Sequence, residues 1–173
     1  AVGEMLAARM GRGLLELGGN NAMIITPSAD MELAIPAILF GAVGTAGQRC
    51  TSTRRVIVHR SMHDSLYEKL KNAYAQLGAK IGSPLEKTTL IGPLIDKASF
   101  DEMQKALAAI KPAAQDIFGG MRALADRYPD GYYVQPAVVK LDKQYEQVMH
   151  EIFAPILYVM PYDTLEDAMR IHN

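Results

Sequence analysis

The chain has 173 residues, of which 49% are hydrophobic and 21% charged, and this composition is typical of a globular protein with one sizeable core. Its 18 Lys and Arg residues nearly balance 19 Asp and Glu residues, and the longest basic cluster is Arg54-Arg55 with Arg49 nearby. Nucleic-acid binding is therefore not expected, because neutralising phosphates needs a clustered basic excess. No apolar run is long enough to cross a bilayer, so no membrane span is expected either.

Residues 4–10 are typical of the end of a helix, which Gly11 and Gly13 stop. A strand is expected next at 22–25, then a buried helix at 30–43 that tolerates Pro36 in its first turns, and a strand at 56–58. Capping-box spacing at 61–64 predicts a further helix, which buries Leu66, Leu70, Ala73, Tyr74 and Leu77. A helix with an apolar stripe over 100–110, strands at 134–139 and 156–159, and a last helix capped by residues 164–167 complete the chain. Strands and helices alternate, which predicts an α/β fold with a largely parallel twisted sheet flanked by helices.

No linker divides the chain, and the stretch 111–132, rich in Gly, Pro, Asp and Arg, is expected to be a surface excursion of one domain. Both ends of the chain lie inside helical patterns, so we expect a piece of a longer polypeptide.

Cys50 is the only cysteine. One thiol excludes an internal disulfide and a cysteine-rich zinc site, and it fits a reducing, cytoplasmic location. His59 and His63 are expected at a strand end and a helix cap, so they share no helical face and no metal site is expected.

Cys50 follows the segment Gly44-Thr45-Ala46-Gly47-Gln48-Arg49. Glycines allow close approach of a ligand to the backbone, and the positive charge of Arg49 favours a thiolate. These features suit a nucleophilic cysteine with a backbone oxyanion donor, whereas the alternative is a small buried hydrophobic residue.

Glu16 interrupts the apolar run Leu14-Leu15-Glu16-Leu17, which Gly18-Gly19 follow. A buried carboxylate is costly, and burial would suit Glu16 to act as a general base near neutral pH. The alternative is that Glu16 lies at a strand end and reaches solvent.

A third motif, Glu151-Ile152-Phe153-Ala154-Pro155, precedes an apolar strand and pairs a carboxylate with an aromatic ring. It suits either a hydroxyl-bearing ligand or an ordinary loop. Gly41, Gly44 and Gly47 recur every third residue, which is neither a dinucleotide fingerprint nor a phosphate loop, so no nucleotide-binding loop is recognisable in this chain.

Three motifs occur in order along the chain: Leu15-Glu16-Leu17-Gly18-Gly19-Asn20, Gly47-Gln48-Arg49-Cys50 and the Glu151 motif. Together they resemble the glutamate, cysteine and Glu-x-Phe signatures of the NAD(P)-dependent aldehyde dehydrogenase superfamily. The 34-residue gap between Glu16 and Cys50 fits the pattern of that superfamily. The stretch Ala42 to Thr51 and the sequence Phe153-Ala154-Pro155-Ile156-Leu157-Tyr158-Val159 resemble the antiquitin branch, the α-aminoadipate semialdehyde dehydrogenases, with Ala154 where most superfamily members have Gly.

The resemblance implies roles for six residues. Cys50 would be the nucleophile that carries a thioester, and Glu16 the base that activates the hydrolytic water. Arg49 would contact the carboxylate of an acidic semialdehyde. Glu151 would hydrogen-bond the nicotinamide ribose of NAD, with NADP not excluded, Phe153 would pack near the nicotinamide, and Gly18 would line the cofactor site.

The resemblance also implies that residues 1–173 are the catalytic domain alone. The cofactor-binding domain would precede the chain, an oligomerisation strand would follow it, and the whole protein would be a homo-oligomer acting on a small aldehyde. Two other functions stay open: a CoA-acylating or other aldehyde dehydrogenase subclass, in which Glu16 is less needed, and a noncatalytic interaction domain of the same fold.

Overall fold

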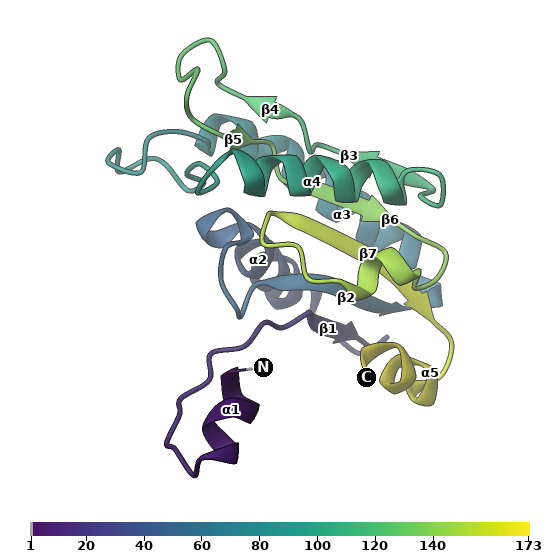
Figure 1. Ribbon diagram of the computed structural model, residues 1–173. Coiled ribbons are helices and arrows are strands. Elements are labelled where there is room, and N and C mark those ends of the chain that lie inside the picture. Colours follow the sequence, from purple (N-terminus) through teal and green to yellow (C-terminus); the bar gives the residue numbers. More distant parts are fainter. Residues whose placement is uncertain (1) are drawn as a thin grey trace.

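A computed structural model describes residues 2–173, and its centre is a five-stranded sheet in the order β1-β2-β7-β6-β3 (Figure 1). The strands are β1 (Asn21–Ile25), β2 (Thr53–His59), β7 (Ile156–Tyr162), β6 (Ala137–Lys140) and β3 (Asp116–Phe118). The pairs β1–β2, β2–β7 and β6–β7 are parallel, and only β3 runs antiparallel to its neighbour β6. The predicted α/β class with a largely parallel sheet is confirmed.

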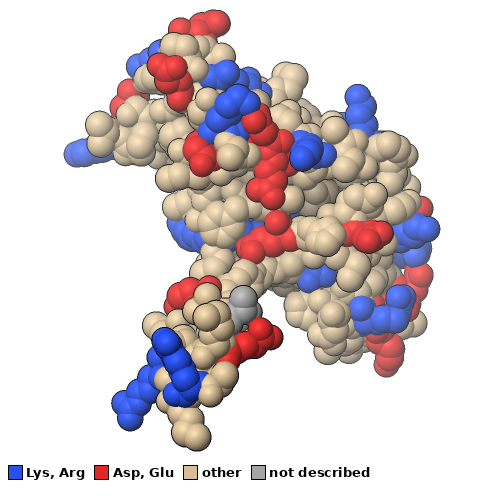
Figure 2. Space-filling model, viewed as in Figure 1, with Lys and Arg blue, Asp and Glu red and all other residues tan. Residues whose placement is uncertain are grey.

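Helices connect and flank these strands. They are α1 (Val2–Ala8), α2 (Met31–Val43), α3 (His63–Ala75), α4 (Lys97–Ile110) and α5 (Leu165–His172), with short 3-10 turns at Gly44–Gly47, Arg60–Met62, Gln76–Lys80 and Glu146–Met149. Helices α2 and α3 contact each other, and α5 packs against β2 and β7. Helix α1 and the link after it extend away from the sheet as an arm (Figures 1 and 2). None of the described helices could cross a bilayer.

The core lies around β2 and β7, the two central strands. Residues 156–162 of β7 are all buried, as are Val56, Ile57 and Val58 of β2. Strands covered on both faces read as continuous apolar runs, which is why both were recognisable in the sequence. Both are longer than expected: β2 begins at Thr53 and includes the buried Arg54 and Arg55, and β7 continues through Pro161 to Tyr162. Proline is tolerated there because β6 pairs with β7 only as far as Val159.

Capping boxes were predicted at the starts of α3 and α5, and the structure has only the one at α5. Thr164 and Asp167 form a capping box at the start of α5, as predicted. The predicted capping box at 61–64 is wrong. A 3-10 turn leads straight into α3, so Met62 occupies the cap position without a side-chain hydrogen bond, and the Ser61 hydroxyl pairs with His59 Nδ1 at 2.8 Å.

The single strand expected at 134–139 is also wrong. Pro136 has no N–H to donate to a ladder, and the chain divides there into β5 (Tyr133–Val134) and β6. Strand β5 pairs instead with β4 (Arg122–Ala123) in a separate two-stranded sheet. The stretch expected to be a surface excursion therefore supplies β4 and the edge strand β3.

Helix α2 is only partly buried, in contrast to the expectation. Asp30 caps it, and Ile38, Ala42 and Val43 are buried, but Leu33 and Phe40 are 71% and 58% exposed. The helix is apolar on every side, so its sequence predicts burial all round, whereas residues 2–173 cover only one of its faces.

His63, at the start of α3, makes the stability of this fold depend on pH. Its side chain is buried, with Nε2 3.3 Å from the Val159 carbonyl oxygen, and burial lowers the pKa of the imidazole below its ordinary value of 6.5. The unfolded chain then binds more protons than the folded chain just below pH 6.5, so stability falls as the pH falls through this range. We expect the melting temperature of the wild type to drop more steeply below pH 6.5 than that of His63→Gln.

His172→Gln is the matched control, because His172 is an exposed histidine on α5. It should keep the wild-type dependence on pH in thermal melts. Parallel curves of melting temperature against pH for the wild type and His63→Gln would show that His63 does not cause this pH dependence.

Candidate active site

The loop that carries Cys50 has a strained backbone. After α2, the residues Thr45, Ala46 and Gly47 have positive φ angles of 52°, 52° and 69°. Thr and Ala rarely adopt this left-handed conformation, which costs about 1–2 kcal/mol for a residue with a Cβ. Strain of this kind persists only where surrounding contacts impose it, and it concentrates at functional sites.

One such contact joins the Cys50 loop to the Glu151 motif. A Cβ added to Gly47 would lie 2.5 Å from the Ala154 carbonyl oxygen and 2.7 Å from the Pro155 nitrogen. The two backbones therefore approach so closely that only glycine fits. Segments far apart in the sequence therefore meet here.

Cys50 itself is exposed, so it is not a small core residue. Its carbonyl oxygen accepts a hydrogen bond of 2.6 Å from Asn21 Nδ2, and a Cβ on Gly19 would lie 3.4 Å from the same oxygen. The backbone N–H of Cys50 donates to no acceptor within residues 2–173. The segment that follows Glu16 thus lies against Cys50, and a free peptide N–H is available beside the thiol.

Glu16 differs from the expectation of a buried carboxylate. Its side chain is exposed in the link between α1 and β1, and it makes no hydrogen bond or ion pair within the described residues. The neighbouring Leu14 and Leu17 are 90% and 71% exposed. The alternative of a carboxylate that reaches solvent therefore matches, because no element within residues 2–173 covers this link.

Gly18 and Glu151 are in direct contact. A Cβ on Gly18 would lie 2.2 Å from Glu151 Oε2, so the carboxylate occupies the space that a side chain would need. The other oxygen, Oε1, lies 3.0 Å from Arg54 Nη2 in an ion pair that is not aligned as a hydrogen bond. The first and third motifs therefore meet at this carboxylate.

Arg54 joins the Cys50 loop to the Glu151 motif, although in the sequence it stands out only as part of the longest basic cluster. Its side chain is 3% exposed. Its guanidinium donates to the carbonyl oxygens of Ser52 at 3.0 Å, Arg49 at 3.0 Å, Gly47 at 3.4 Å and Ile152 at 3.2 Å. Burial lowers the pKa of Arg54, and the nearby Glu151 carboxylate partly offsets that effect.

Arg49 lies over the ring of Phe40, with its guanidinium carbon 5.6 Å from the ring centroid. Both residues line a cavity of about 420 Å³. A second cavity, of about 520 Å³, is lined by Phe153 and Ile95 among others, and the two cavities share Thr45, Gln48 and Pro93. Arg49 and Phe153 therefore face adjoining spaces on the two sides of the Cys50 loop.

Gln48 lines both cavities and bonds to the loop on their other side. No role of its own was assigned to it from the sequence. Its Oε1 accepts a hydrogen bond of 2.8 Å from the Ile95 N–H, and its Nε2 lies 3.3 Å from the Pro93 carbonyl oxygen. The residue beside Arg49 thus fixes the loop after Gly92 against the Cys50 loop.

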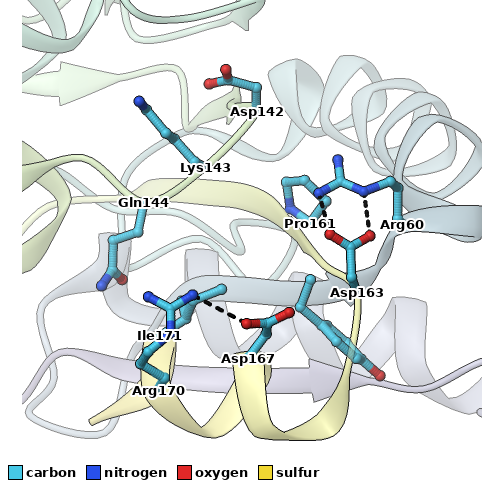
Figure 3. A pocket seen from close by; sticks show the side chains of 10 residues that line it. Arg60, Asp142, Lys143, Gln144, Pro161, Asp163, Asp167, Arg170 and Ile171 are labelled. Atoms are coloured by element: carbon cyan, nitrogen blue, oxygen red, sulfur yellow. Dashed lines mark hydrogen bonds and ion pairs between the residues drawn. The ribbon is translucent and has the colours of Figure 1, made fainter.

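A charged cavity of about 360 Å³ lies elsewhere, beside α5 and the ends of β2 and β7 (Figure 3). Four of its charged side chains are paired within the cavity: Arg60 Nη2 donates to Asp163 Oδ2 at 2.8 Å, and Arg170 Nη2 donates to Asp167 Oδ1 at 3.2 Å. No group of three His, Cys, Asp or Glu residues with metal-binding geometry occurs within residues 2–173. Figure 2 shows basic and acidic side chains interspersed over one face of the molecule.

Comparison with known proteins identifies the family. Residues 1–173 match the family model described as the aldehyde dehydrogenase family over the whole chain. This chain belongs to the aldehyde dehydrogenase family. The resemblance drawn from the Glu16, Cys50 and Glu151 motifs is confirmed.

Relatives also agree with the antiquitin branch. The chain is 45% identical to a homologue of aldehyde dehydrogenase family 7 member A1 from Caenorhabditis elegans, over 99% of the chain and 32% of the relative. It is 42% identical to α-aminoadipic semialdehyde dehydrogenase from Bos taurus, over 99% of the chain and 31% of the relative. It therefore spans about a third of the length of these curated relatives.

Among solved structures, the chain is similar to a point mutant of betaine aldehyde dehydrogenase from Staphylococcus aureus in complex with NAD+. The TM-score is 0.90 and the sequence identity 29%, covering 99% of this chain and 34% of the other. The fold is therefore that of the matching third of an aldehyde dehydrogenase.

The contact between Gly47 and Ala154 yields a prediction about stability. Gly47→Ala would place a Cβ on top of the Ala154 carbonyl oxygen at a positive φ, so we expect a clear loss of stability, on the order of 2 kcal/mol or more, measured by chemical denaturation. Gly78→Ala is the matched control, because nothing lies within 4 Å of its Cβ position, and it should be neutral or slightly stabilising. Equal stability of the two variants would contradict the close approach.

Proposed function

We propose that this chain is the cysteine-bearing catalytic domain of an NAD-dependent aldehyde dehydrogenase that oxidises an acidic semialdehyde to its carboxylate. The convergence of three sequence motifs on one site carries the proposal. Gly19 and Asn21 lie at Cys50, Gly18 lies at Glu151, and Gly47 lies at Ala154. An interaction domain without catalysis has no need for these motifs to meet around an exposed thiol.

Cys50 is the nucleophile in this proposal. Its thiolate attacks the aldehyde carbon and forms a thiohemiacetal, whose oxyanion accepts a hydrogen bond from the Cys50 backbone N–H. That N–H has no other acceptor within the described chain, which makes it available for this role. Sγ afterwards holds the acyl group as a thioester.

Glu16 removes a proton from the water that hydrolyses the thioester. The exposure of its side chain and the lack of a partner leave it free to turn toward that water. Hydrolysis releases the carboxylate and returns Cys50 to the thiol. A CoA-acylating enzyme would instead transfer the acyl group to a second thiol, and it would not depend on Glu16.

The residues at Glu151 fit a nicotinamide cofactor. Gly18 leaves room for the Glu151 carboxylate, which is 24% exposed and suits a pair of ribose hydroxyls. Phe153 is 42% exposed and lines the cavity beside Gln48, where its ring would pack near a nicotinamide. When bound, NAD supplies the acceptor for the hydride of the aldehyde carbon.

Arg49 recognises the acidic end of the substrate in this proposal. A guanidinium can bind a carboxylate with two parallel hydrogen bonds, and Arg49 lines the cavity next to the one that Phe153 lines. The similarity to α-aminoadipic semialdehyde dehydrogenase supports a semialdehyde of that class.

The rest of the enzyme would lie outside residues 1–173. The chain matches about a third of its relatives, and α2 and the Glu16 link expose apolar side chains such as Leu14, Leu33 and Phe40. These surfaces are suited to pack against a cofactor-binding domain, and the assembled protein would be a homo-oligomer.

Replacing Cys50 tests the proposal directly. In the full-length protein that carries this chain, Cys50→Ala should lower NADH formation from α-aminoadipate semialdehyde by roughly a thousandfold or more, because the nucleophile is lost. Thermal melts should stay close to wild type, because Cys50 is exposed. Glu16→Gln should leave a stoichiometric burst of NADH and accumulate an acyl-enzyme visible by mass spectrometry.

The 173-residue chain alone should form no NADH, because the cofactor would lack one wall of its site. Full turnover by Cys50→Ala would refute the role of Cys50 as the nucleophile, absence of turnover in the wild-type protein would refute the enzymatic proposal, and turnover that requires added CoA would favour the acylating subclass.

Arg49 predicts a difference between substrates. Arg49→Gln should raise the KM for the acidic semialdehyde by roughly tenfold or more through loss of a charged hydrogen bond, whereas the KM for a neutral aldehyde such as hexanal should change little. Arg49→Lys keeps the charge and should recover part of the loss. Equal changes for both aldehydes would contradict a role in binding the carboxylate.

A further inference from the structure

Arg54 lies between the two loops that form the site. On one side its guanidinium donates to the carbonyl oxygens of Gly47, Arg49 and Ser52, which surround Cys50 in the sequence. On the other side its Nε donates to the Ile152 carbonyl oxygen. One buried side chain therefore bonds to backbone on both sides of Cys50 in the sequence and to backbone between Glu151 and Phe153.

The same guanidinium contacts both side chains assigned to the cofactor. Arg54 Nη2 lies 3.0 Å from Glu151 Oε1, and its guanidinium carbon lies 5.3 Å from the centroid of the Phe153 ring. A planar cation with five N–H donors suits this set of partners, whereas a lysine ammonium could satisfy only part of it.

Arg55 provides a comparison, because it is also a buried arginine but bonds to different partners from those of Arg54. The adjacent Arg55 is similarly buried and donates to the carbonyl oxygens of Asn20, Ile171 and His172 and to the side chain of Gln144. Successive side chains of a strand point to opposite faces of the sheet, and on its face Arg55 ties the residue before β1 to the end of α5. Its partners include neither Glu151 nor Phe153.

We propose that Arg54 is a positioning residue that holds Glu151 and Phe153 in register with the Cys50 loop, and that through these two residues it sets the affinity for NAD. This inference rests on the proposed function, because the roles of Glu151 and Phe153 belong to it. Arg54 interacts electrostatically with Cys50, but its hydrogen bonds go to backbone carbonyl oxygens, and in this proposal its effect on NAD passes through the loop at 150–155.

Hydrogen–deuterium exchange of the 173-residue chain, without cofactor, tests the positioning alone. Arg54→Gln removes the charge and most donors, so exchange of the hydrogen-bonded amides in the two loops, Ala154 in 150–155 and Ser52 in 47–52, should accelerate by about tenfold to a hundredfold, the amount that one charged hydrogen bond contributes. Arg55→Gln is the matched control, and its acceleration should fall at 20–21 and 171–173 instead. Arg54→Lys keeps the charge in a milder variant and should accelerate 150–155 to an intermediate extent.

Binding of NAD to the full-length protein, measured by equilibrium titration, tests the consequence. The Kd should rise about tenfold or more for Arg54→Gln and less for Arg54→Lys, while Arg55→Gln should keep the wild-type Kd even where its melting temperature falls as much. If Arg54 only stabilised the fold, Arg54→Gln and Arg55→Gln variants that lower the melting temperature equally would also change the Kd for NAD equally.

The outcomes separate the two proposals. Wild-type exchange in 150–155 for both Arg54 variants would overturn the positioning role whether or not NAD binds. Failure of the wild-type protein to bind NAD would overturn the proposed function and the link to affinity, while accelerated exchange would still establish that Arg54 holds the loop. If the wild-type protein binds NAD tightly and Arg54→Gln has the same Kd, the effect of Arg54 on NAD affinity is overturned, whereas its role in positioning the loop is not.

Discussion

The site depends on one constraint, which is that the buried guanidinium of Arg54 must be fully paired. A charge removed from water is costly unless hydrogen bonds and an opposite charge replace its hydration. Four carbonyl oxygens and the Glu151 carboxylate meet that need. Because these acceptors belong to two loops far apart in the sequence, satisfying one side chain brings the loops together.

Glycine makes the remaining contacts available. Gly18 yields its side-chain space to a carboxylate, and Gly47 yields its space to a peptide group. At both places a backbone group or a carboxylate oxygen lies where a Cβ would otherwise be. Of these two glycines, only Gly47 also needs the conformational freedom of glycine, because its φ is positive.

Much of the fold and the grouping of the site could be predicted from sequence because the signals were local. Apolar strands such as 156–159, the Thr164 cap and the three spaced motifs each need only a short window to be recognised. The burial of Arg54 and Arg55 could not be predicted, because it depends on carbonyl acceptors supplied by distant loops. The exposure of the Phe40 side of α2 was missed for the opposite reason, since apolar neighbours indicate burial only where another element lies over them. For the same reason the sequence left both a buried and an exposed Glu16 open, and the structure has it exposed.

The run of left-handed residues from Thr45 to Gly47 has a consequence for the order of folding. This conformation is unfavourable in the isolated chain for two of its three residues, and the contact that imposes it comes from the segment just before β7. Local helices such as α3 and α4 need no such partner and form from contacts near in sequence. The Cys50 loop therefore takes its shape only after the sheet has gathered β7 beside β2, so Cys50 is among the last parts of the molecule to reach its native geometry.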